Sequence, residues 1–192
     1  MARPRDPRRR TEILDAAIGH LVETGIANLS LRPLAHALGH STRVLTHHFV
    51  DKDDLLTAVL ERLDEIQHGQ LRATEGWDDT SRGIGAIARD SWRRHLEPEN
   101  IGATRLIHEI EGLAAAGRLG GRVPKFLADR AEFVAEALQA RGLAPDAARV
   151  HATFLNSAYA GLQTDFLVTG DRARTEAALA DLCALADSWT RR

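Results

Sequence analysis

Residues 30–49 read SLRPLAHALGHSTRVLTHHF, and this stretch predicts two short helices joined by a tight turn. Pro33 is tolerated in the first turn of a helix, and Gly39 ends that helix because glycine readily takes a positive φ. A three-residue turn then ends at Ser41, a good N-cap for the second helix. The small Ala35 lets the two helices approach closely, so the spacing predicts a helix-turn-helix.

The rest of the chain is also predicted to be helical. A longer helix over about residues 9–24 precedes the pair, with apolar residues at helical spacing on one face. Another follows over about residues 54–71, and glycine and proline breaks separate five more, at 81–96, 100–119, 123–141, 145–168 and 171–189. We therefore expect an all-α fold of about nine helices. Residues 1–52 would form a three-helix domain with a basic N-terminal arm, and residues 53–192 a larger helical domain.

Charge is distributed unevenly along the chain, although the net charge is only −2. Residues 1–52 hold eight of the 25 basic and five of the 27 acidic residues, a net of +3, which leaves −5 on the remainder. A basic N-terminal part on an acidic body is typical of a protein whose N-terminal part meets a polyanion. Prolines at positions 4 and 7 disfavour helix before about Arg8, so we expect an arm that becomes ordered on contact.

Cysteine use and hydropathy indicate a soluble, cytoplasmic protein. The single cysteine, Cys183, excludes an intrachain disulfide framework, and no apolar run approaches the roughly 18–20 residues that span a bilayer. The basic start is followed by an amphipathic stretch that carries acidic residues, which is unlike a signal peptide.

No enzymatic activity, cofactor or metal site is expected. Nucleophile and phosphate-binding motifs are missing, and the i, i+3 pair of His108 and Glu111 has no second pair to complete a metal site.

The helix-turn-helix residues resemble the DNA-binding domain of the TetR family of bacterial regulators. The resemblance covers about residues 10–63 and is carried by Ser30–Ala35, Gly39, Ser41, Val44–Phe49, Lys52, Leu55 and Leu56. One position departs from the pattern, because the family usually has a tyrosine where this chain has Thr46, at a position that typically meets the DNA backbone. The resemblance implies a homodimer of nine-helix subunits, joined by a four-helix bundle from the last two helices of each subunit. It also implies repression of transcription that a ligand relieves.

The second helix of a helix-turn-helix enters the major groove, so its leading residues are candidates for base contacts. Arg43 opens this helix, and Thr46 and His47 lie one turn further on the same side. Arg32 and Lys52 stand at flanking helix starts, within expected reach of phosphates or groove edges. The predicted DNA-binding residues are Arg32, Ser41, Thr42, Arg43, Thr46, His47 and Lys52. The expected partner is double-stranded DNA with a near-palindromic site.

A small-molecule effector would bind among aromatic and polar residues of the middle helices and the penultimate helix. The candidate ligand-binding residues are Trp92, Ile107, His108, Glu111, Phe126, Phe133, Phe154, Tyr159 and Gln163. Several aromatics and few charges favour an apolar or aromatic ligand. The last two helices are apolar on more than one face, so we expect them to pack against a partner, which favours a homodimer.

These observations together predict a sequence-specific DNA-binding regulator, a repressor that a small molecule releases from DNA. The alternative is a helical small-molecule-binding protein that has lost DNA binding, which Thr46 leaves open. A helical enzyme is a weaker alternative, because no catalytic constellation emerges from the residues.

Overall fold

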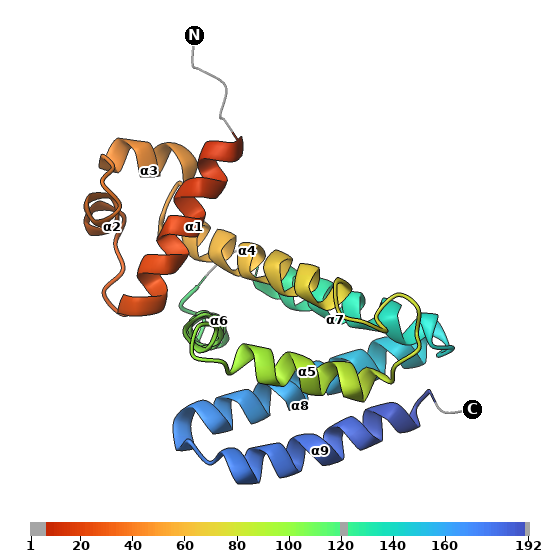
Figure 1. Cartoon of the computed structure of the whole chain (residues 1–192). Helices are drawn as coiled ribbons and strands as arrows, with labels where there is room; N and C mark the ends of the chain where they lie inside the picture. Colours follow the sequence, from red (N-terminus) through yellow and green to blue (C-terminus); the bar gives the residue numbers. More distant parts are fainter. Residues whose placement is uncertain (1–6, 120–122, 191–192) are drawn as a thin grey trace. The chain divides into compact units, whose positions relative to one another are not determined.

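The structure is a computed structural model that describes residues 7–119 and 123–190. These residues form nine α-helices and no strand, so the predicted all-α fold is confirmed (Figure 1). The helices are α1 (Pro7–Thr24), α2 (Leu31–Ala37), α3 (Thr42–His48), α4 (Lys52–Arg72), α5 (Ile84–His95), α6 (Ile101–Ala115), α7 (Val123–Ala140), α8 (Pro145–Thr169) and α9 (Arg172–Ser188). Among the described residues, no helix is both long enough and apolar enough to cross a bilayer.

The chain divides into two compact units. Unit 1 comprises Met1–Asp64 and Pro98–Phe126, and unit 2 comprises Glu65–Glu97 and Leu127–Arg192. Unit 1 therefore holds α1 to α3, the first part of α4 and all of α6, rather than ending near residue 52. Residue 52 as the limit of a DNA-binding domain stays a prediction.

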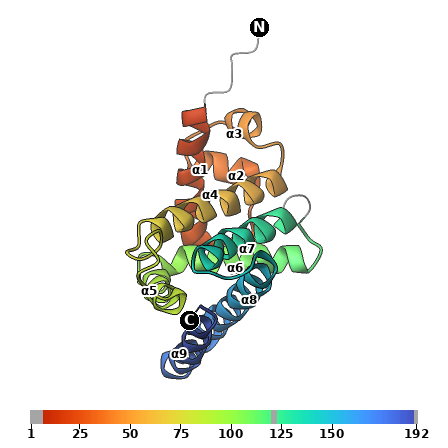
Figure 2. The ribbon, with the colours of Figure 1, turned by 90° about the vertical axis from the view of Figure 1, so that its right-hand side faces the viewer.

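The core of unit 1 is built by the apolar faces of its helices. The predicted stripe on α1 is present, with Leu14, Ala17 and Leu21 at most 4 % exposed. Leu45 of α3 and Leu56 of α4 are fully buried in the same cluster. Helices α2 and α3 lie beside each other and against α1 (Figure 2). The amphipathic patterns therefore account for the assembly of the helix-turn-helix.

Four helix ends differ from the sequence-based expectation by two residues or more. Helix α1 begins at Pro7 rather than about residue 9, and α5 begins at Ile84 rather than residue 81. Local hydrogen bonds explain the other two. Helix α4 begins at Lys52 rather than Asp54, because the Asp51 carboxylate accepts a hydrogen bond from the Asp54 amide at 2.8 Å and caps the helix earlier. Helix α6 ends at Ala115 rather than near residue 119. Gly117 there takes a φ of +67°, and the Arg118 amide bonds back to the Leu113 carbonyl at 2.9 Å.

In unit 2, α9 packs closely against both α5 and α8. The α5 contact depends on Gly85, where a Cβ would lie only 2.2 Å from the backbone oxygen of Cys183. The Gly85 amide donates a hydrogen bond to the Asp187 carboxylate at 2.8 Å, so α9 also satisfies an orphan amide at the start of α5. Gly85 of α5 therefore determines which face of α9 packs inside unit 2.

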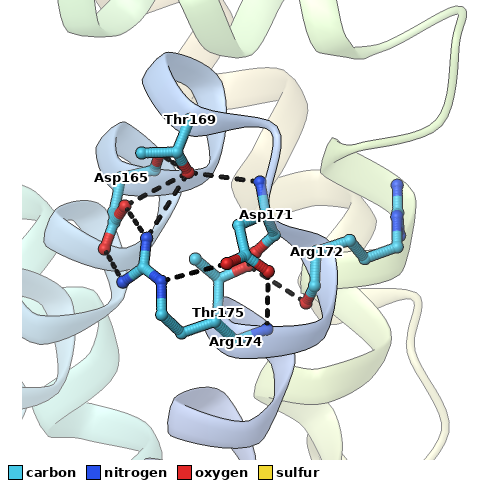
Figure 3. Close-up of polar contacts among 6 residues, drawn as sticks. All are labelled: Asp165, Thr169, Asp171, Arg172, Arg174 and Thr175. Atoms are coloured by element: carbon cyan, nitrogen blue, oxygen red, sulfur yellow. Dashed lines mark hydrogen bonds and ion pairs between the residues drawn. The ribbon is translucent and has the colours of Figure 1, made fainter.

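Three charged residues, Asp165, Asp171 and Arg174, form a cluster at the turn between α8 and α9, called the clasp below (Figure 3). The Arg174 guanidinium makes a bidentate contact with the Asp165 carboxylate, at 2.7 and 2.6 Å, and its Nε lies 3.3 Å from Asp171 Oδ2. Asp171 also caps α9 by accepting a hydrogen bond from the Arg174 amide at 3.0 Å. The turn itself passes through Gly170, which has a φ of +70°. Because the two helices are joined at this end, the clasp stabilises the α8–α9 hairpin.

The clasp predicts an acid-sensitive contribution to stability. The hydrogen bonds from Arg174 lower the pKa of Asp165 below its ordinary value of 3.8. A depressed folded-state pKa means that the stabilisation is complete above the ordinary pKa and is lost as the pH falls through the lowered one. Asp165→Asn should therefore lower the melting temperature at pH 7 and flatten the fall of stability below about pH 4.

Thermal unfolding followed by circular dichroism between pH 2 and 7 measures this effect. Asp146→Asn is the matched control, because Asp146 is 94 % exposed and its ion pair is with Arg149, one turn further along the same helix. Equal acid dependence for the wild type and Asp165→Asn would contradict the role of the clasp.

Candidate nucleic-acid interface

Helix α3 has one buried face and one exposed face. Leu45 and Phe49, the last at the C-cap, are fully buried against the core of unit 1. Arg43, Thr46 and His47 are exposed and follow an i, i+3, i+4 spacing, so they share the opposite face. The structure thus brings together the residues predicted to enter the major groove.

An open hollow of about 580 Å³ lies along this exposed face. It is lined by Arg9, Ser41, Arg43, Val44, Thr46, His47 and His48. Ser41 forms the predicted N-cap, its hydroxyl accepting a hydrogen bond from the Val44 amide at 3.4 Å. Arg9 adds a positive charge from the first turns of α1; it belongs to the basic arm that the sequence predicts to meet a polyanion, but not to the individually predicted DNA-binding residues. The hollow therefore combines two guanidinium groups with exposed side chains of α3.

The Thr46 hydroxyl is directed back to its own helix. Its Oγ1 donates to the Thr42 carbonyl at 3.1 Å and lies 3.4 Å from the Arg43 carbonyl. This is the usual bond of a helical threonine to the preceding turn.

Arg32 and Lys52 flank α3 in the chain and have different surroundings. Arg32 is exposed on α2, as expected of a phosphate contact. Lys52 is only partly exposed, and its Nζ lies 3.5 Å from the Ile26 carbonyl. The Ile26 amide in turn donates to the Glu109 carboxylate of α6 at 3.3 Å. Lys52 thus helps to hold the loop after α1, and its ammonium group retains further donors.

The predicted N-terminal arm is only partly within the described residues. Residues 1–6 lie outside them, and α1 already includes Arg8, Arg9 and Arg10. Pro7 is the first helical residue, a position that suits its fixed φ. Arg10 places its guanidinium over the Phe49 ring, 5.1 Å from the centroid, which ties α1 to the end of α3. Arg10 therefore has a structural role that a count of basic residues does not reveal.

The candidate effector residues fall into both units. In unit 1, Ile107 and Phe126 are core residues, and His108 Nδ1 lies 3.7 Å from Glu111 Oε2. In unit 2, Phe133 stacks between the rings of His68 and Trp77, while Phe154 is 49 % exposed and meets Trp189 edge-on. Over the described residues, no group of three or more metal-ligating side chains occurs.

The other three candidates, Trp92, Tyr159 and Gln163, gather around His95 in unit 2. The Tyr159 hydroxyl and the Gln163 amide nitrogen each lie 3.3 Å from His95 Nδ1. Trp92 meets the Tyr159 ring edge-on at 5.6 Å and is 1 % exposed. The Trp92 indole N–H has no hydrogen-bond partner among the described residues. Burial raises the pKa of the Tyr159 hydroxyl, which therefore stays neutral and able to donate.

His95 was missed in the sequence, although a signal for it was present. It stands three residues after Trp92 on α5, a spacing that places both side chains on one helix face. The basic arm already includes Arg9, but its place beside Arg43 in the hollow depends on how α1 packs against α3, which the sequence does not show.

The chain is similar in sequence to bacterial transcription regulators. Residues 13–59 match the family described as bacterial regulatory proteins, tetR family. The HTH-type transcriptional regulator BetI of Klebsiella pneumoniae (strain 342) is 28 % identical over 102 residues, which are 45 % of this chain and 52 % of that protein. BetI of Paraburkholderia phytofirmans is 34 % identical over 82 residues, 43 % of this chain and 37 % of that protein. The chain thus aligns with about half or less of the length of these curated relatives.

Solved structures show the same fold over nearly the whole chain. The multidrug-binding protein EbrR, in complex with imidazole, is 28 % identical with a TM-score of 0.73, covering 97 % of this chain and 94 % of that chain. A TetR-family member from Streptomyces coelicolor A3 is 27 % identical with a TM-score of 0.74, covering 94 % and 99 %. The likeness therefore extends beyond the residues that the family match covers.

Proposed function

Because the chain belongs to the tetR family of bacterial regulatory proteins, we propose that it is a sequence-specific DNA-binding transcriptional repressor. The observation that supports this best is the exposed face of α3, where Arg43, Thr46 and His47 border the hollow. In this proposal α3 enters the major groove of a near-palindromic operator, in the cytoplasm of a bacterial cell, and a small-molecule effector releases the protein.

The DNA contacts divide into base contacts and phosphate contacts. Arg43 stands at the leading end of α3 with no acidic partner within its hollow, so its guanidinium can bind guanine O6 and N7. Thr42 and His47 would meet neighbouring base edges. Arg9, Arg32, Ser41 and Lys52 would contact phosphates and set the register of α3 in the groove.

A homodimer through α8 and α9 would place two such helices on one operator. Small and apolar residues form an exposed stripe along α8 at Val150, Phe154, Ser157, Gly161, Thr164 and Val168. Exposed alanines follow helical spacing along α9 at Ala173, Ala177, Ala180 and Ala184. Small side chains allow two helices to approach closely. The apolar residues towards the ends of the α8 stripe, Val150, Phe154 and Val168, cost free energy when they are exposed to water. The opposite faces pack within unit 2, which leaves these stripes for a second copy.

The effector would contact the cluster of Trp92, His95, Tyr159 and Gln163 in unit 2. A buried indole N–H without a protein partner costs free energy unless a ligand or water accepts its hydrogen bond. An aromatic compound with a hydrogen-bond acceptor would stack in these surroundings and satisfy that donor. The multidrug-binding EbrR has the same fold, which fits such a ligand class.

Arg43→Ala tests the base contact. Loss of a bidentate contact to guanine should cost about 1–3 kcal/mol of discrimination between the operator and a mismatched duplex. Fluorescence anisotropy with a duplex from the region upstream of the gene, at several salt concentrations, measures it. Arg93→Ala, an exposed arginine of α5, is the control and should bind like the wild type. Unchanged operator affinity and unchanged salt dependence for Arg43→Ala would show that Arg43 does not contact DNA.

Gly161→Arg tests the dimer. A Cβ at Gly161 meets nothing within 4 Å, so the subunit can accommodate the side chain, but a partner helix packed on the stripe cannot. Light scattering after size-exclusion chromatography should show a dimer for the wild type and a monomer for the variant. Gly69→Arg, at an equally open position on α4, should remain dimeric. A dimeric Gly161→Arg protein would place the interface elsewhere.

Trp92→Phe tests the effector cluster, because it keeps an aromatic ring and removes the indole N–H. Aromatic compounds that raise the melting temperature of the wild type should also release the operator duplex. Their affinity for Trp92→Phe should be about tenfold lower, as expected for one lost hydrogen bond in a buried site. Compounds that bind both proteins equally would rule out a contact with Trp92.

A further inference from the structure

On the exposed face of α3, the Thr46 side chain exposes its methyl group rather than its hydroxyl group. Thr46 has one hydroxyl hydrogen, and the structure directs it to the Thr42 carbonyl at 3.1 Å. The side chain of a helical threonine is stiff at χ1, so fixing the oxygen also fixes the methyl carbon. Because the oxygen faces the helix backbone and the residue is exposed, the methyl group is the part of the side chain that faces solvent.

This geometry argues against a phosphate contact by the Thr46 hydroxyl. Phosphate oxygens are hydrogen-bond acceptors, so a threonine must donate to bind one. The hydroxyl hydrogen, the one donor of the Thr46 side chain, already bonds to the Thr42 carbonyl. The other polar atom near the hydroxyl, the Arg43 carbonyl oxygen at 3.4 Å, is also an acceptor. A phosphate contact would require the intrahelical bond to break first.

An apolar contact requires no such change. In the major groove, thymine alone among the four ordinary bases presents a methyl group, and a threonine methyl is a known match for it. Val44 also lines the hollow, but it lies two residues before Thr46 and packs partly against the core of unit 1, so the Thr46 methyl group carries the contact. Arg43, one helical turn before Thr46, would contact a nearby guanine and hold the helix at that depth.

We propose that Thr46 is a specificity-determining residue that recognises a thymine in each half-site through the thymine C5-methyl group. The proposal rests on the proposed function, since it concerns the same face of α3.

Replacement of thymine by uracil tests it, because uracil lacks only the C5-methyl group. An operator is first selected from a random duplex library with the full-length protein, and each thymine pair related by its symmetry is then replaced by uracil. At one such pair, the affinity of the wild type should fall about fourfold for each half-site in which thymine is replaced. This is the effect of removing one methyl group from an apolar contact. Every other replacement should leave the affinity unchanged.

Two substitutions of Thr46 then assign the effect to the methyl group. Thr46→Ser keeps the hydroxyl and removes the methyl, so it should bind the thymine operator about fourfold more weakly per half-site and be indifferent to uracil. Thr46→Val keeps a methyl and removes the hydroxyl, so it should retain the sensitivity to uracil. Thr24→Ser is the matched control, because Thr24 makes the same kind of bond, to the His20 carbonyl of α1 at 2.9 Å.

Three results would overturn the proposal. They are an operator with no uracil-sensitive position, equal uracil sensitivity in the wild type and Thr46→Ser, and loss of affinity in Thr46→Val but not in Thr46→Ser. Each of these leaves the proposed function intact, since all are measured on a protein that binds its selected duplex. A library that yields no salt-dependent, sequence-specific binder would instead contradict DNA binding and the thymine contact together.

Discussion

The burial of Leu45 and Phe49 is the constraint on which the rest of the interface depends. Helix α3 has only seven residues, so it has little stability of its own and takes its orientation from what it packs against. With these two side chains fully buried, the 3.6-residue period turns Arg43, Thr46 and His47 outward. The Arg10 guanidinium over Phe49 and the Ser41 cap hold the two ends of α3 in that orientation.

In unit 2, too, the packed faces of the helices determine which faces stay exposed. Close contact at Gly85 and the clasp at Arg174 determine which faces of α8 and α9 pack within the subunit. The faces that remain carry small side chains with apolar residues at intervals, a composition suited to another helix pair rather than to water. In both units, therefore, a tightly packed inner face determines which residues of these helices stay exposed.

Local patterns in the sequence were sufficient for the helices and for the exposed face of α3. Glycine and proline mark most helix ends, and the i, i+3, i+4 spacing of Arg43, Thr46 and His47 follows from the position of Leu45. The contacts that could not be predicted join distant residues. The sequence places Arg10 in a basic arm and does not show that its guanidinium lies over Phe49. It likewise does not show that the Lys52 ammonium lies 3.5 Å from the Ile26 carbonyl, and the phosphate contact of Lys52 stays a prediction. Nothing in the local sequence encodes these contacts, because tertiary packing creates them.

Amide hydrogen exchange of the full-length protein, with and without its operator duplex, tests the central claim that α3 presents its exposed face to DNA. DNA in contact with that face should slow exchange across Ser41–His48 and at the start of α1, and the slowing should diminish as salt is raised. Unchanged exchange in α3 at saturating DNA, with slowing confined to unit 2, would contradict the claim.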